Sequence, residues 1–306
     1  MRDAFVDTLC ELAQEDENIY LITGDLGYNV LDKFWNQYPE RFLNAGICEQ
    51  NMASIAAGLA VEGDKSVFIY SIGNFPTLRC LEQIRNDIAY HYANVKIVSV
   101  GAGFAYGPMG MSHHATEDVA VLRSIPGVKV FTPADPFEAR IATQIANKLS
   151  GPVYLRLGKG HEPNLERIDT DIQYGKMSLL KEGEDAAILA MGAIAGVALE
   201  AAKRSKEKIA VYSVPFIKPF DTDRVKALAL KYKVLYTLEE HNRIGGLGSA
   251  VSETVADYGL GIKVVRLGLD ETFTGIVGDQ NYLRKAYRIN AESILDYIRE
   301  NQNGQL

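Results

Sequence analysis

Residues 41–60, RFLNAGICEQNMASIAAGLA, place one carboxylate, Glu49, in an almost uncharged run shortly after the turn residue Gly46. The small residues that follow it predict a helix that another backbone can approach closely. Burial favours the neutral form of a carboxyl because the charged form loses its hydration, and buried catalytic acids use that proton to donate a hydrogen bond. The other interpretation is that Glu49 is a carboxylate stabilised by the positive end of the helix dipole. Chemistry alone leaves both open.

Length and composition are those of a globular protein with room for two domains: 306 residues, 47% hydrophobic and 23% charged. A net charge of -7 argues against a general nucleic-acid surface, which needs a basic patch. The N-terminal segment lacks a signal-type apolar core, and no apolar run is long enough to span a membrane. Cys10, Cys48 and Cys80 cannot all pair and show no metal-type spacing, which favours a reduced, cytoplasmic compartment.

Apolar strands alternate with helices along the first half of the sequence. This order predicts a doubly wound α/β domain whose parallel sheet is covered on both faces. Asp135, before Pro136, is the expected N-cap of one helix. The expected helices are 2–15, one from Glu49, 77–91 and 136–148, and the expected strands are 19–23, 66–70, 95–100, 128–131 and 153–157.

The alternation stops over residues 158–184, a polar stretch that holds Pro163, Gly175 and Gly183. We expect a linker there with one or two edge strands. A second alternating set follows and predicts a smaller α/β domain, so that the domains are residues 1–165 and 185–306, joined by a linker at 166–184. The expected strands of the second domain are 187–190, 209–214, 234–238 and 263–267, and its expected helices are 197–205, 221–231, 248–258 and one from 291.

The segment GICEQNM at Gly46–Met52, followed by AAGLA at residues 56–60, resembles the signature of transketolases. The resemblance implies thiamine diphosphate as the cofactor, which supplies the carbanion chemistry while the protein supplies orientation and electrostatics. In that family the glutamate that matches Glu49 bonds the aminopyrimidine ring of the cofactor. An Asp-Leu pair lies close to the thiazolium ring, and Asp25 and Leu26 match it. An aspartate that only fixes a turn is the other interpretation of Asp25.

Two further motifs extend the resemblance. Phe75 begins the pattern F-x-x-x-R-x-x-E-Q-I-R, whose phenylalanine stacks on the aminopyrimidine, and Ile72 stands where many relatives carry a second aromatic. The residues alone would instead favour a core aromatic. GMSHHATEDVAVLR at residues 110–123 resembles the family run in which the first histidine, here His113 with His114 beside it, faces the substrate. Histidine titrates near neutral pH, which suits proton transfer on a sugar hydroxyl, and no third ligand at metal-site spacing accompanies the pair.

The glycine-rich loop at residues 101–110 half-imitates a dinucleotide fingerprint, but its third glycine is displaced and no helix is expected to open there. Three positions depart from the transketolase pattern. Met109 stands for an aspartate that faces the acceptor hydroxyl, and Gly101 and Asn29 stand for a histidine and a serine that contact phosphate. The departures predict an acceptor other than an ordinary aldose phosphate, unless a partner or Lys159, a candidate anion contact, supplies the phosphate contacts.

The resemblance covers nearly the whole chain, because EEH at 239–241 and GGLG at 245–248 match the family's C-terminal domain, where we expect His241 to be structural. A module that binds magnesium and the diphosphate, marked by G-D-G, is missing. The resemblance thus implies the C-terminal (β) subunit of a split transketolase, a transferase that moves a two-carbon ketol unit from a ketose donor to an aldose or keto-sugar acceptor. An N-terminal (α) subunit would carry the Mg²⁺ ligands in an α2β2 heterotetramer.

Three alternatives stay open. The β subunit of a 2-oxo acid dehydrogenase shares the two-domain plan but usually reads I-T-E-x-G-F around the glutamate. A 1-deoxyxylulose-5-phosphate-synthase-like enzyme is normally one chain. A non-catalytic scaffold subunit belongs to a different class, and the presence of Glu49, Phe75 and His113 argues against it.

Overall fold

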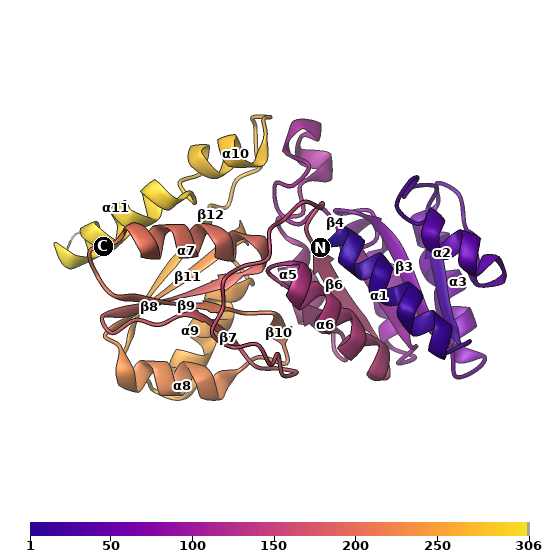
Figure 1. Ribbon diagram of the computed structural model, residues 1–306, viewed down its shortest axis with the longest axis horizontal. Helices are drawn as coiled ribbons and strands as arrows, with labels where there is room; N and C mark the ends of the chain where they lie inside the picture. Colours follow the sequence, from indigo (N-terminus) through magenta and orange to yellow (C-terminus); the bar gives the residue numbers. More distant parts are fainter. Residues whose placement is uncertain (305–306) are drawn as a thin grey trace.

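The protein is described as a computed structural model over residues 1–304, in which two α/β units, each with its own sheet, lie side by side (Figure 1). The first sheet has the strand order β10-β5-β6-β4-β3-β1-β2. Its neighbours are parallel except the edge strand β10, which runs antiparallel to β5. Its strands are β1 (Ile19–Thr23), β2 (Phe42–Asn44), β3 (Ser66–Ile72), β4 (Val95–Val100), β5 (Lys129–Phe131), β6 (Val153–Leu157) and β10 (Phe216–Lys218).

The second sheet has the order β12-β11-β8-β9-β7. Only β7, which comes from the predicted linker, is antiparallel to its neighbour, so the expectation of an edge strand there is confirmed. The two mostly parallel sheets confirm the predicted fold class. The strands are β7 (Ser178–Lys181), β8 (Ala186–Met191), β9 (Ile209–Ser213), β11 (Val234–Asn242) and β12 (Lys263–Leu269).

Helices cover both faces of each sheet (Figure 1). Strand β3 shows why: Val67 and Ile69 pack in one core with α3, while Phe68 and Tyr70 pack in another with α1, because successive side chains of a strand point to opposite faces. The helices are α1 (Arg2–Glu15), α2 (Asp32–Gln37), α3 (Glu49–Val61), α4 (Leu81–Gln83), α5 (Asp118–Ser124), α6 (Pro136–Lys148), α7 (Ala195–Arg204), α8 (Thr222–Lys231), α9 (Leu247–Asp257), α10 (Gln280–Ala286) and α11 (Ala291–Gln302).

The helix expected at 77–91 is present over residues 78–89, but it is not one regular α-helix. That segment is a 3₁₀ turn at Leu78–Cys80, the short α4 and a π-helical stretch at Ile84–Ala89. Hydrophobic spacing could not reveal the π-helical stretch, because Ile84 and Ile88 are buried four residues apart, as in an ordinary α-helix. The elements β2, β10, α2, α5 and α10 were not predicted either.

The loop after β4 rises at the top of Figure 1 as two 3₁₀ turns, Gly107–Met109 and Met111–His113, beside α10. In this sheet β3 lies between β1 and β4 and is parallel to both, so the carboxyl ends of the three strands point to the same edge. The predicted site residues of the first domain are therefore gathered at one edge. No helix within residues 1–304 combines the length and apolar character needed to cross a membrane.

Candidate active site

The loops after β1, β3 and β4 meet the start of α3 at the carboxyl edge of the first sheet, where parallel α/β sheets bind their ligands. Two glycines, Gly24 and Gly73, let the loops come this close because they have no side chain. A Cβ on Gly24 would lie 3.2 Å from Glu49 Cγ, and one on Gly73 would lie 2.8 Å from the carbonyl oxygen of His113. Gly73 also has a left-handed φ of 52°, so a side chain there would be strained as well as crowded.

Glu49 is the first residue of α3 and is only 3% exposed. Its Oε2 accepts a hydrogen bond of 2.8 Å from Nη1 of Arg79, whose side chain is 44% exposed. In this chain the guanidinium of Arg79 is therefore the hydrogen-bond partner of the buried carboxyl group. A buried carboxylate without such a partner would be costly.

The same arginine also covers Phe75. The guanidinium carbon of Arg79 lies 4.1 Å from the centroid of the Phe75 ring, within the range of a cation–π contact. The Phe75 ring in turn meets the His113 ring edge-on, with centroids 5.1 Å apart. Glu49, Arg79, Phe75 and His113 thus form one continuous group, although they are spread over 65 positions of the sequence.

His113 is half-buried, with Nδ1 3.0 Å from the hydroxyl oxygen of Ser112. Burial lowers the pKa of His113, and the nearby His114 and Arg79 lower it further. The imidazole is therefore neutral at pH 7 and has one nitrogen that can accept a proton and one that can donate.

His114 lies deeper than its neighbour. It is 2% exposed, its Nε2 is 3.2 Å from the carbonyl oxygen of Gly107, and its ring packs edge-on against Phe104 at 5.2 Å. Its own carbonyl oxygen accepts a 2.7 Å hydrogen bond from the side-chain amide of Asn74. These contacts place His114 beneath the loop, as a support for it.

Asp25, Leu26 and Ile72 lie at the ends of the strands that border the group. Asp25 has a left-handed φ of 57°, and its Oδ1 accepts hydrogen bonds of 2.9 Å from the Asn44 amide and from the Tyr28 hydroxyl. These bonds, that of Asn44 above all, lower the pKa of Asp25. Leu26 is half-buried after β1, and Ile72 is the half-buried last residue of β3.

The space above Gly101 is filled by Tyr106, a residue that sequence reasoning missed. A Cβ at Gly101 would lie 2.2 Å from the Tyr106 ring, so no side chain fits at this position. Lys159 is exposed and its Nζ lies 4.9 Å from the centroid of the same ring. The available sequence signal was an aromatic residue within a glycine-rich loop. A glycine such as Gly101 leaves the space that the ring of Tyr106 occupies.

Asn29 and Met109 are both exposed. Asn29 has a φ of 59°, and its N–H donates to Asp32 Oδ2 at 2.9 Å. Met109 is 62% exposed and ends the first 3₁₀ turn of the loop. Within residues 1–304, neither side chain is joined by a hydrogen bond to the group around Glu49.

A buried polar network beneath the loop was also missed. Arg156 donates from Nε to Asp118 Oδ2 at 2.8 Å, and Tyr154 donates its hydroxyl proton to the same oxygen at 2.5 Å. Asp118 is fully buried, and although burial by itself raises its pKa, the Arg156 guanidinium, His241 and the Tyr154 hydroxyl together lower the pKa below its ordinary value. A buried charge requires such partners, so the one charged residue of the apolar strand β6, Arg156, was the available sequence signal.

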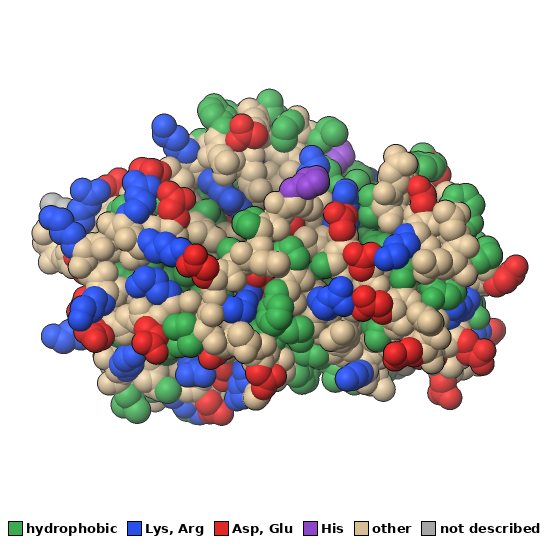
Figure 2. Space-filling view, in the orientation of Figure 1, with side chains coloured by type: hydrophobic (Ala, Val, Ile, Leu, Met, Phe, Trp, Pro, Cys, Tyr) green, Lys and Arg blue, Asp and Glu red, His purple; other side chains and the backbone are tan. Residues whose placement is uncertain are grey.

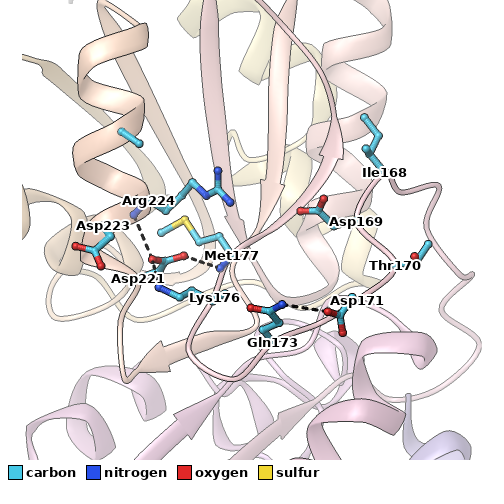
Figure 3. A pocket seen from close by; sticks show the side chains of 11 residues that line it. Ile168, Asp169, Thr170, Asp171, Gln173, Lys176, Met177, Asp221, Asp223 and Arg224 are labelled. Carbon is cyan, nitrogen blue, oxygen red and sulfur yellow. Dashed lines mark hydrogen bonds and ion pairs between the residues drawn. The ribbon is translucent and has the colours of Figure 1, made fainter.

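A polar pocket of about 650 Å³ lies elsewhere, between residues 168–177 and the start of α8 (Figure 3). Its buried carboxylate, Asp221, accepts hydrogen bonds from the backbone N–H groups of Met177 and Arg224 at 3.0 and 3.1 Å, and it pairs with Lys176. Asp221 is thus the N-cap of α8, and none of the predicted site residues lines this pocket. The predicted site residues lie instead at the carboxyl edge of the first sheet.

The candidate site suits a heteroaromatic cofactor ring. The carboxyl oxygens of Glu49 can bond a ring nitrogen, and the face of the Phe75 ring can stack on the cofactor ring. The side chain of Arg79, which is 44% exposed, covers both groups. Residues 1–304 contain no group of three His, Cys, Asp or Glu side chains that could hold a metal ion. The carboxylate of Glu49 and the ring of Phe75 fit the organic part of such a cofactor.

Comparisons with known proteins agree with this geometry. Residues 1–163 match the transketolase pyrimidine binding domain, and residues 175–294 match the transketolase C-terminal domain. A Methanocaldococcus jannaschii protein assigned as a transketolase C-terminal section is 38% identical, with 98% of this chain and 95% of that protein covered. One subunit of the apulose-4-phosphate transketolase of Phocaeicola vulgatus is 36% identical, with 86% of each chain covered. A solved split gene transketolase, an inactive β4 tetramer, has a TM-score of 0.88 and 36% identity, over 98% of this chain and 97% of that one.

The chain belongs to the transketolase family. Its relatives are matched along nearly their whole length and are C-terminal sections or separate subunits of split transketolases, so this chain is a transketolase-type transferase subunit of that kind. The alternative of a 1-deoxyxylulose-5-phosphate-synthase-like enzyme is more distant. Family membership implies thiamine diphosphate as the cofactor.

Proposed function

We propose that this β subunit binds the aminopyrimidine of thiamine diphosphate and, with a partner, transfers a two-carbon ketol unit from a ketose to an aldose or keto-sugar acceptor. The observation that carries the proposal is the group in which Arg79 covers both the Glu49 carboxylate and the Phe75 ring, with His113 against that ring. The cofactor supplies the carbanion chemistry when bound. We take residues 1–165 as the pyrimidine-binding domain, 166–184 as the linker and 185–306 as the C-terminal domain.

Each side chain has a defined task in this proposal. Glu49 holds a ring nitrogen of the aminopyrimidine, and Phe75 and Ile72 flank that ring, while Asp25 and Leu26 border the thiazolium. Arg79 has to leave Glu49 and Phe75 for this to happen, because it covers both groups in the free chain. In this proposal the ring nitrogen takes the place of Arg79 as the hydrogen-bond partner of Glu49, so the buried carboxyl group keeps a partner when Arg79 moves away.

His113 is the proton carrier on the substrate side of the site. Its lowered pKa keeps the imidazole neutral at pH 7, so that it can take a proton from a sugar hydroxyl and return it. Ser112 fixes the ring by its contact with Nδ1. His114 supports the loop that carries His113.

The active site is completed by an N-terminal (α) subunit that binds Mg²⁺ and the diphosphate, in an α2β2 heterotetramer. The sequence lacks the G-D-G motif for that task, and a similar split gene transketolase is an inactive β4 tetramer. Exposed apolar side chains at the site support a covering partner: hydrophobic groups gather at the top of Figure 2, over the loop after β4. The exposed apolar side chains include Tyr28 in the loop after β1, Ile47 in the loop after β2, Met109 and Met111 in the loop after β4, and Val277 before α10.

The acceptor is proposed to differ from an ordinary aldose phosphate. Gly101 has no room for a phosphate-binding side chain because Tyr106 fills its place, and Met109 cannot accept the strong hydrogen bond that a carboxylate takes from a hydroxyl. Lys159 or the α subunit could instead hold a phosphate. A kcat/KM for ribose 5-phosphate or erythrose 4-phosphate as high as that of an ordinary transketolase would refute the altered specificity.

The experiment that tests the function compares the chain alone with the chain mixed with the N-terminal-section transketolase subunit of the same organism. Calorimetry with thiamine diphosphate and Mg²⁺, followed by a ketol-transfer assay over a panel of sugars, should give tight binding and turnover only for the mixture. Tight cofactor binding by the isolated chain would contradict the division of labour between the subunits. We also propose a cytoplasmic location, in keeping with the free thiols of Cys10, Cys48 and Cys80.

A further inference from the structure

The loop that carries His113 is closed at its base by a pair of backbone hydrogen bonds. The N–H of Gly103 donates to the carbonyl oxygen of Ala115 at 3.0 Å, and the N–H of Ala115 donates to that of Gly103 at 3.1 Å. His113 stands two positions before Ala115, and a Cβ on Gly73 would almost touch its carbonyl oxygen. The position of His113 against Phe75 therefore depends on where this base lies.

A carboxylate from the other domain lies directly under the base. Glu240, on β11 of the second sheet, has a side chain that is 5% exposed, and its Oε1 accepts the N–H of Phe104 at 2.5 Å. A Cβ on Gly103 would lie 2.6 Å from Cγ and Oε1 of Glu240. Gly103 has a φ of 59°, so both its backbone conformation and the proximity of the carboxylate require glycine here.

Glu240 is itself held by two side chains of α10. Arg284 donates from Nε to Oε2 at 2.5 Å, and Gln280 donates from Nε2 to Oε1 at 2.8 Å. The segment before α10 also touches the loop, because a Cβ on Gly107 would lie 2.3 Å from the carbonyl oxygen of Gly278. Figure 1 shows the two turns of the loop beside α10. One carboxylate thus joins the loop, β11 and α10.

The other side of the base is held by Arg156. Its Nη2 donates to the carbonyl oxygens of Ala115 at 2.7 Å and of Glu240 at 3.1 Å. The backbone N–H of Asn242 donates to the carbonyl oxygen of Thr116 at 2.8 Å. The base is therefore held between the two domains: the C-terminal domain contributes the side chain of Glu240 and the backbone N–H of Asn242.

We propose that Glu240 is a positioning residue for ketol transfer: it fixes the base of the loop and so holds His113 against Phe75, an inference that rests on the proposed function of His113. Hydrogen bonds to a charged acceptor are stronger than neutral ones. A glutamine at this position keeps one acceptor oxygen for three donors and turns an NH₂ group toward some of them, which leaves buried donors unpaired. The change is thus local to the base of the loop.

The test uses Glu240→Gln in the full chain, with Glu239→Gln as the matched control. Glu239 is the next residue and equally buried, but its carboxylate accepts the N–H groups of Leu247 and Gly248 at the start of α9, away from the loop. Hydrogen exchange should become at least tenfold faster at Phe104 and Gly103 in Glu240→Gln only. Titration of the His113 ring by NMR should show its pKa rising toward the ordinary value, because a loosened loop buries the ring less.

Further readouts separate positioning from folding and from the proposed function. If Glu240→Gln does not fold, Gln280→Ala removes one hydrogen bond of the same carboxylate and should give a smaller change in the same direction. In the complex with the α subunit, Glu240→Gln should lower kcat at least tenfold with little change in cofactor affinity. Wild-type exchange and an unchanged His113 titration in the folded variants would overturn the inference. Absence of ketol transfer by the wild-type complex would instead refute the proposed function.

Discussion

The ion pair between Arg79 and Glu49 can be tested in the chain without its partner. The perturbation is a double-mutant cycle of Arg79→Met, which keeps most of the unbranched stem, and Glu49→Gln, which keeps the shape of the side chain. The pair has one buried member, 3% exposed, and one that is 44% exposed, with 2.8 Å between Nη1 and Oε2. Arg79→Met therefore leaves a buried carboxylate without its cation.

The expected magnitude follows from these exposures. Removing one partner of a fully buried pair costs about 3–5 kcal/mol, whereas exposed pairs contribute about 0.2–1 kcal/mol. Because solvent reaches the Arg79 side of this pair, we expect Arg79→Met to lower the free energy of unfolding by about 1–2 kcal/mol. The coupling energy of the cycle should be about 1 kcal/mol, since Glu49→Gln removes the charge that needs Arg79.

Urea unfolding of the four proteins, followed by circular dichroism, measures the coupling. Arg85→Met is the matched control: Arg85 is exposed, and among residues 1–304 its Nη1 donates to the neighbouring Asn86, so its loss should change stability by less than about 0.5 kcal/mol. A coupling below about 0.3 kcal/mol, the usual error of additivity, would refute the claim that Arg79 and Glu49 stabilise each other in the free chain.

Three further predictions concern other parts of the molecule. His113→Asn should lower kcat of the complex about 100-fold, and the wild-type kcat/KM should fall only below pH 6.5, because burial lowers the pKa of His113; an acid limb above pH 7 would contradict this. Burial lowers the pKa of Lys96 to about 7, so the unfolded chain binds more protons between pH 7 and 10.5, and stability should rise with pH across that window by up to about 5 kcal/mol. Urea unfolding should show no such rise in Lys96→Met. Gly101→Ala should cost about 2 kcal/mol in the same assay because of its left-handed φ and the Tyr106 ring, and less when Tyr106→Ala is also present; equal costs in both backgrounds would rule out the clash.

Local signals in the sequence predicted much of the fold. Asp135 caps α6 through a hydrogen bond from the N–H of Glu138 to its side chain, and an N-cap depends only on the residues beside it. The short strand β10 could not be predicted in the same way. Phe216 pairs with Phe131, 85 positions earlier, and no local pattern reports such a pairing.

The candidate site divides in the same manner. The family motifs predicted Glu49, Phe75 and His113. They did not predict that Arg79, which lies in the 3₁₀ turn at Leu78–Cys80, contacts both Glu49 and Phe75. Glu240 serves the His113 loop from a strand more than 120 positions away. Contacts of this kind are set by the packing of two domains, which sequence spacing does not encode.

The central claim is that Glu49 acts on the cofactor within an assembly of two kinds of subunit. Exchange of the C2 proton of thiamine diphosphate for deuterium, followed by NMR after rapid quench, measures that action directly. With the α subunit and Mg²⁺ present, the wild-type chain should accelerate the exchange, and Glu49→Gln should lose at least about 100-fold of that rate while it still binds the α subunit. Exchange at the wild-type rate in Glu49→Gln would contradict the account.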